Sequence, residues 1–128
     1  LSTHAKEEQM PTPAEAEAVI ENYFEAWNAC QTERIRELVA NPVVRHYAGK
    51  TISMNVDEQL TRIKDRHAKS KPDFQPLIRH SDGTYVTVIW NCAYADGKKT
   101  CGSETFKVID GRIAEVWNPL TIDEGNWA

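Results

Sequence analysis

Glu104 is the residue of this sequence whose type and position most clearly suggest chemistry. It lies in a β-rich segment, residues 100–109, and successive side chains of a strand point to opposite faces. Glu104 therefore shares a face with the apolar Phe106 and Val108, and this face is expected to look inward. Burial disfavours an ionised carboxylate, so the pKa of Glu104 is expected to rise, as it does in many general acids and bases. The alternatives are an ion pair with a nearby Arg or Lys, or a β-bulge that turns the side chain outward.

Three further polar side chains are candidates for the same site. Tyr23 lies in an apolar helical stripe, where a buried hydroxyl needs a hydrogen-bond partner. His46 follows a short β-rich run, and an imidazole can transfer protons near neutral pH. His67, on the apolar face of another helix, is the weaker candidate, because a histidine at a helix C-terminus often only interacts with the dipole. A structural role is open for each: Tyr23 as a core aromatic, and His46 bonded to a backbone carbonyl. We expect Glu104, His46 and Tyr23 to converge on one pocket.

Several other kinds of site are not indicated. The four histidines lack the H-x-x-x-H spacing of a zinc helix, and the three cysteines include no C-x-x-C pair. No phosphate loop or dinucleotide fingerprint occurs. We therefore expect neither a metal nor a cofactor.

Length and charge limit the remaining classes. The 128 residues suit one domain, and the net charge of −4 argues against a nucleic-acid partner. No run approaches the ~20 apolar residues that span a bilayer, so no membrane association is expected. The polar residues 1–10 do not resemble a signal peptide, which makes the cytoplasm the expected location. Residues 1–11 are expected to form a flexible arm, and residues 12–128 a single domain.

The pattern of apolar residues changes period near Pro72. Helices are predicted over residues 13–28, 32–40 and 55–71, with a short strand at 43–47. Strands are predicted at 74–80, 85–95, 100–109 and 112–118, the last three joined by Asp-Gly turns. This order predicts an α+β fold in which three N-terminal helices pack on one face of a curved antiparallel sheet. The sheet is expected to have four to six strands in the second half of the chain.

A motif near the C-terminus is similar to a known signature. Residues 104–118 read ETFKVIDGRIAEVWN, and this run resembles the D-x-F-R-x-x-D-G-K-I-x-E-H-W-D signature of SnoaL-like proteins. These proteins belong to the wider NTF2-like and ketosteroid-isomerase-like fold, and the likeness extends to Tyr23 and to residues 44–49. The sequence departs from the signature at Val116, in place of histidine, and at Asn118, in place of an acid. The resemblance implies a cone-shaped fold around a pocket for a small, largely apolar or aromatic molecule.

The resemblance also implies roles for the candidate residues. Glu104 stands where ketosteroid isomerases have the acid that donates to the substrate oxyanion, Tyr23 where they have the oxyanion tyrosine, and His46 where they have the aspartate base. The first hypothesis is a cofactor-free acid–base enzyme of the isomerase, cyclase, dehydratase or hydrolase type. The alternative is a non-catalytic domain that binds a small molecule or another protein. Residues predicted to contact the substrate are Trp27, His67, Trp90, Phe106, Trp117 and Asn118.

Three helices can cover only one face of a long sheet. The opposite face is expected to carry Thr87 with Ile89, or Val88 with Tyr94, depending on the register. A homodimer formed through this face is therefore predicted.

Overall fold

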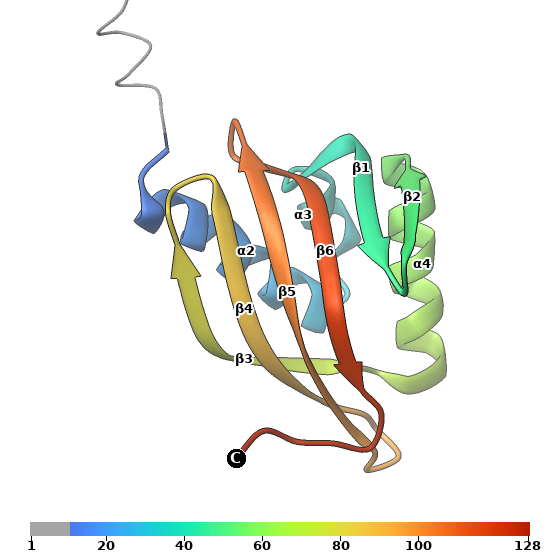
Figure 1. Ribbon diagram of the computed structural model, residues 1–128. Coiled ribbons are helices and arrows are strands. Elements are labelled where there is room, and N and C mark those ends of the chain that lie inside the picture. The colour runs from blue at the N-terminus through green and yellow to red at the C-terminus, as the bar shows by residue number, and fades with distance from the viewer. Residues whose placement is uncertain (1–10) are drawn as a thin grey trace, which may run out of the picture.

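The computed structural model describes residues 11–128, in which three helices pack against a six-stranded sheet (Figure 1). The helices are α2 (Pro13–Asn28), α3 (Thr32–Arg36) and α4 (Val56–Ser70). The strands are β1 (Val39–Tyr47), β2 (Lys50–Met54), β3 (Asp73–Ser81), β4 (Tyr85–Ala93), β5 (Lys99–Ile109) and β6 (Arg112–Ile122). The arm expected at residues 1–11 lies, apart from Pro11, outside the described residues.

The two long helices begin where local sequence signals predict. The Thr12 side chain caps α2 by accepting a hydrogen bond from the backbone N–H of Glu15, at 3.1 Å. Helix α4 begins with a capping box, in which Asn55 accepts from the Glu58 N–H at 2.8 Å and the Glu58 carboxylate accepts from the Asn55 N–H at 3.3 Å. The observed starts of both helices agree with the predicted starts, because each start depends on residues next to it in the sequence.

The region between these helices differs from the prediction. The second helix ends at Arg36, not at residue 40, and β1 already begins at Val39. Val39 pairs with Ile113 of β6, and the Ile113 N–H donates to the carbonyl of Leu38 at 2.8 Å. This long-range pairing overrides the local helical pattern. A turn at Ala48 and Gly49, with φ of 52° and 73°, then leads into β2, a strand that was not predicted.

The sheet order is β2-β1-β6-β5-β4-β3. All neighbouring strands run antiparallel except β1 and β6, which are parallel, so the sheet is mostly antiparallel and the predicted α+β fold is confirmed. The four strands predicted in the second half are present, and two further strands come from the first half. Figure 1 shows α2 lying across one face of the curved sheet and α4 running beside β1 and β2.

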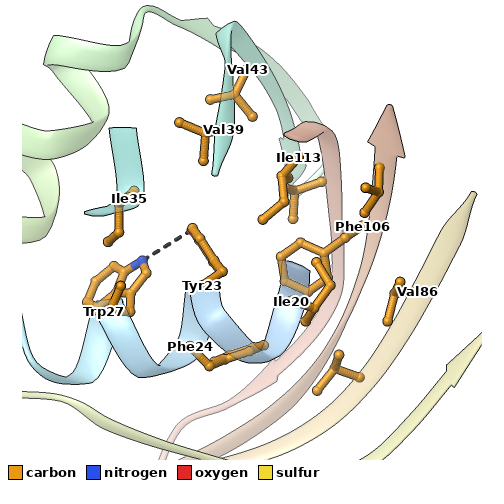
Figure 2. Close-up of a cluster of buried hydrophobic side chains, with 14 of the residues drawn as sticks. Ile20, Tyr23, Phe24, Trp27, Ile35, Val39, Val43, Val86, Phe106 and Ile113 are labelled. Atoms are coloured by element: carbon orange, nitrogen blue, oxygen red, sulfur yellow. Dashed lines mark hydrogen bonds between the residues drawn. The ribbon is translucent and has the colours of Figure 1, made fainter. Parts of the chain in front are cut away.

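Strand register determines which side chains look toward the helices. Residues paired across neighbouring strands share a face of the sheet. One row across the inner face consists of Val86, Phe106, Val116 and Arg45. Phe106 is fully buried there, with its ring 5.8 Å from that of Tyr23 on α2 (Figure 2). The next row, which lies on the outer face, consists of Thr87, Thr105, Trp117 and His46.

Candidate functional site

A cavity of about 250 Å³ lies between the inner face of the sheet and helices α2 and α4. Its aromatic wall consists of Tyr23, Phe24, Trp27, Phe74, Trp90 and Tyr94. Its charged residues are Arg45, Arg62, Arg66 and Glu104, and His46, Tyr47, Val116, Asn118 and Thr121 complete the lining. The site is therefore an aromatic cavity with several charged groups, more polar than the largely apolar pocket that was predicted.

Glu104 faces this cavity from β5, on the same side as Phe106, as strand alternation predicts. Its side chain is only 13% exposed, and its Oε2 lies 3.6 Å from Nη2 of Arg45. Burial raises the pKa of the Glu104 carboxyl, although the charges of Arg45 and Arg62 oppose the rise. The ion pair considered as an alternative is thus present, but at 3.6 Å it exceeds ordinary hydrogen-bond length. Glu104 combines burial, a raised pKa and access to the cavity.

Arg45 lies in β1, where its side chain is 11% exposed. Its Nη1 is buried and has no hydrogen-bond partner within residues 11–128. Burial opposes the charge, but Tyr23 and Glu104 outweigh it and hold the pKa of Arg45 above its ordinary value. Arg45 was not among the predicted site residues. Its alternation with His46 was visible in the sequence, but the choice between the two faces was not.

Two more arginines reach the cavity from α4. Arg62 and Arg66 are one helical turn apart, so their side chains lie on the same side of the helix. The guanidinium of Arg66 lies 5.9 Å from the centre of the Trp27 ring. Burial lowers the pKa of Arg62, and the charges of Arg45 and Arg66 lower it further. Neither residue was among the predicted site residues; their i, i+4 spacing beside the apolar Ile63 was the available signal.

Tyr23 contributes a buried hydroxyl from α2. Its oxygen accepts hydrogen bonds from Nε1 of Trp27 at 3.2 Å, drawn in Figure 2, and from Nε2 of Gln59 at 3.3 Å. These two donors occupy the lone pairs of the oxygen, so the hydroxyl hydrogen remains available for donation. Since Tyr23 lines the cavity, a ligand oxygen is a suitable acceptor.

His46 is among the residues that line the cavity, as are Glu104 and Tyr23, but each of its ring nitrogens has another partner. Nδ1 contacts Oγ1 of Thr51 at 2.9 Å, and Nε2 contacts Oε2 of Glu115 at 2.5 Å. The ring stacks on Trp117, with centroids 5.1 Å apart, in the outer row of the sheet. Both nitrogens are therefore occupied, and the residue beside it in β1, Arg45, has its side chain on the inner face.

The residues predicted to contact substrate fall into two groups. Trp27, Trp90 and Asn118 line the cavity. The other three are not among the described residues that line it: His67 bonds through Nε2 to the carbonyl of Trp27, Phe106 is in the core, and Trp117 stacks on His46. The buried indole N–H of Trp90 has no hydrogen-bond partner within residues 11–128.

Within the described part of the chain, no three His, Cys, Asp or Glu side chains are grouped as a metal ion would need. None of the helices described is long and apolar enough to cross a bilayer.

Comparison with known proteins shows likeness in structure. No protein-family model matches the chain, and comparison with curated proteins gives no match. A proposed ketosteroid isomerase from Kribbella flavida superposes with a TM-score of 0.77 at 18% identity, over 93% of this chain and 85% of that one. An LEH-like epoxide hydrolase of M. tuberculosis gives 0.74 at 17% identity, over 84% and 83%. A proposed polyketide cyclase from Sinorhizobium meliloti gives 0.69 at 22% identity, over 79% and 93%. At these identities the likeness shows a shared fold.

Proposed function

We propose that this chain, which has the NTF2-like fold, is a cofactor-free enzyme that transfers a proton to or from a small molecule in the cavity. The observation that supports the proposal is Glu104, a buried carboxyl with a raised pKa that faces the cavity. Similar structures are named as an isomerase, a cyclase and an epoxide hydrolase, which agrees with acid–base chemistry but selects no reaction.

Each residue of the proposed mechanism has a distinct task. Glu104 exchanges the proton, and Arg45 stabilises the carboxylate when it is ionised. The hydroxyl of Tyr23 donates to the oxygen on which negative charge develops, such as a carbonyl oxygen during enolisation. Trp27 and Trp90 pack against the apolar part of the substrate. His46 has no task in this mechanism because both of its ring nitrogens are occupied.

A second candidate function is a binding domain without catalysis. The ion pair between Arg45 and Glu104 favours it, because a carboxylate with a charged partner can be purely structural. Both ring nitrogens of His46 already have partners, so Glu104 is the one group proposed to exchange protons. The absence of a second such group from the proposed mechanism also agrees with a binding domain.

Proton exchange at a ketone separates the two functions. We would follow exchange of the α-hydrogens of 2-tetralone and of its 6-carboxylate in D₂O by NMR. The wild type should accelerate exchange in one of these ketones, and Glu104→Gln should reduce the accelerated rate by about 100-fold or more. Glu115→Gln is the matched control, because that carboxylate binds His46 on the outer face. Equal rates for wild type and Glu104→Gln would contradict proton transfer by Glu104 and favour the binding domain.

A further inference from the structure

Two residues that line the cavity carry buried hydrogen-bond donors without acceptors among residues 11–128. Nη1 of Arg45 and Nε1 of Trp90 are both buried; the Tyr23 hydroxyl lies near the Arg45 guanidinium and the Glu104 carboxylate near the Trp90 indole, but within residues 11–128 neither nitrogen makes a hydrogen bond of ordinary geometry. Within the same residues the Tyr23 hydroxyl accepts two hydrogen bonds and donates none. Buried donors without acceptors are rare in folded proteins, because each has lost its hydrogen bonds to water. Several such donors around one cavity indicate that a bound molecule supplies the acceptors.

The charges of the lining point to the same kind of ligand. Three arginines, Arg45, Arg62 and Arg66, line the cavity together with one carboxylate, Glu104. Within the described residues neither Arg62 nor Arg66 makes an ion pair, and Glu104 pairs only with Arg45. The lowered pKa of Arg62 reflects its burial and the repulsion from Arg45 and Arg66. An anion between these side chains would relieve that repulsion.

We infer that the cavity binds a small aromatic or alicyclic carboxylate, whose anionic group accepts hydrogen bonds from Nη1 of Arg45. A planar carboxylate matches the fork of a guanidinium, and Arg62 and Arg66 supply further positive charge. The rings of Trp27, Phe74 and Trp90 suit a flat apolar body. The inference rests on the proposed function in that it names the substrate class of the same cavity. Its test measures binding and needs no turnover.

Matched ligands test the inference by isothermal titration calorimetry. The probes are 2-naphthoate and the neutral 2-naphthalenemethanol, which share the ring system and differ in charge. The wild type should bind the carboxylate at least 10-fold more tightly than the alcohol. Arg45→Met keeps a long side chain without the charge and should bring the ratio of the two affinities close to one. Arg79→Met is the control, because Arg79 lies on β3, outside the residues that line the cavity, and it should leave the ratio unchanged.

The outcomes separate this inference from the proposed function. If Arg45→Met does not fold, Arg62→Met serves in its place and should lower the ratio at least 3-fold. Any of three results would overturn the inference. They are equal affinities of the wild type for the two probes, no saturable binding of 2-naphthoate at millimolar concentration, and an unchanged affinity ratio in the folded arginine variant. A wild type that prefers 2-naphthoate but accelerates exchange in neither ketone would overturn the proposed catalysis and leave the ligand class standing.

Discussion

Replacing Tyr23 by phenylalanine should destabilise the protein, although the ring itself is kept. Tyr23 is 3% exposed, and its ring packs against Phe24 and Phe106 in an arrangement that phenylalanine can reproduce. The hydroxyl accepts hydrogen bonds from Nε1 of Trp27 and Nε2 of Gln59. The substitution therefore leaves two buried N–H groups without their acceptor.

The magnitude follows from the number of donors and their distances. Each buried donor that loses its acceptor costs about 1–3 kcal/mol. The two bonds, at 3.2 Å and 3.3 Å, are long, so each belongs in the lower part of that range. We expect Tyr23→Phe to lower the free energy of unfolding by about 2–4 kcal/mol. Urea unfolding followed by circular dichroism measures this loss. Tyr85→Phe is the control, because Tyr85 is 41% exposed, and it should change the stability by less than about 0.5 kcal/mol.

A double-mutant cycle with Gln59 shows whether the cause is correct. Gln59 is 1% exposed, and its Oε1 has no partner within residues 11–128, so Gln59→Leu removes both one donor and an unpaired acceptor. In the Tyr23→Phe background, Gln59→Leu should recover about 1 kcal/mol or more. A loss below about 0.5 kcal/mol for Tyr23→Phe, or strictly additive changes in the cycle, would mean that the lost hydrogen bonds are not the cause.

Three further predictions concern stability and assembly. Asn28→Ala should lower the free energy of unfolding, measured in urea, by about 1–3 kcal/mol. The reason is that the Asn28 side chain accepts from the N–H of Phe74 at 2.7 Å and donates to its carbonyl at 2.8 Å. An unchanged urea midpoint would contradict this. Burial raises the pKa of Glu104 in the folded state, so the contribution of Glu104 to the stability should be lost as the pH rises above about 4.5 toward the folded pKa. The Tm of Glu104→Gln minus that of the wild type should therefore increase with pH, and a constant difference would oppose this. We also propose a homodimer through the outer face, where register places Ile78 and Leu120, 58% and 40% exposed, in one row. Ile78→Lys should weaken it in sedimentation velocity, whereas a wild-type monomer at micromolar concentration would contradict the proposal.

Features controlled by neighbouring residues could be predicted from the sequence. Thr12 and Asn55 cap the two long helices through bonds that span three residues. The Asp-Gly turns join strands close to the predicted positions because their backbone conformation depends on the turn residues themselves. The inward orientation of Glu104 follows from alternation along its own strand, where Phe106 and Val108 mark the buried face.

Features that depend on distant segments could not be predicted in this way. Val39 belongs to a pattern that fits a helix, but its pairing with Ile113, far along the chain, makes it the first residue of a strand. In β1 the alternation of side chains along a strand is enough to predict that Arg45 and His46 point to opposite faces. Which of the two looks inward depends on the register between β1 and β6, because a slip of one residue would exchange the faces. In the folded protein Arg45 pairs with the buried Val116, which places Arg45 on the inner face. The same assembly brings Arg62 and Arg66 of α4 over this row and converts an expected apolar pocket into a positively charged one.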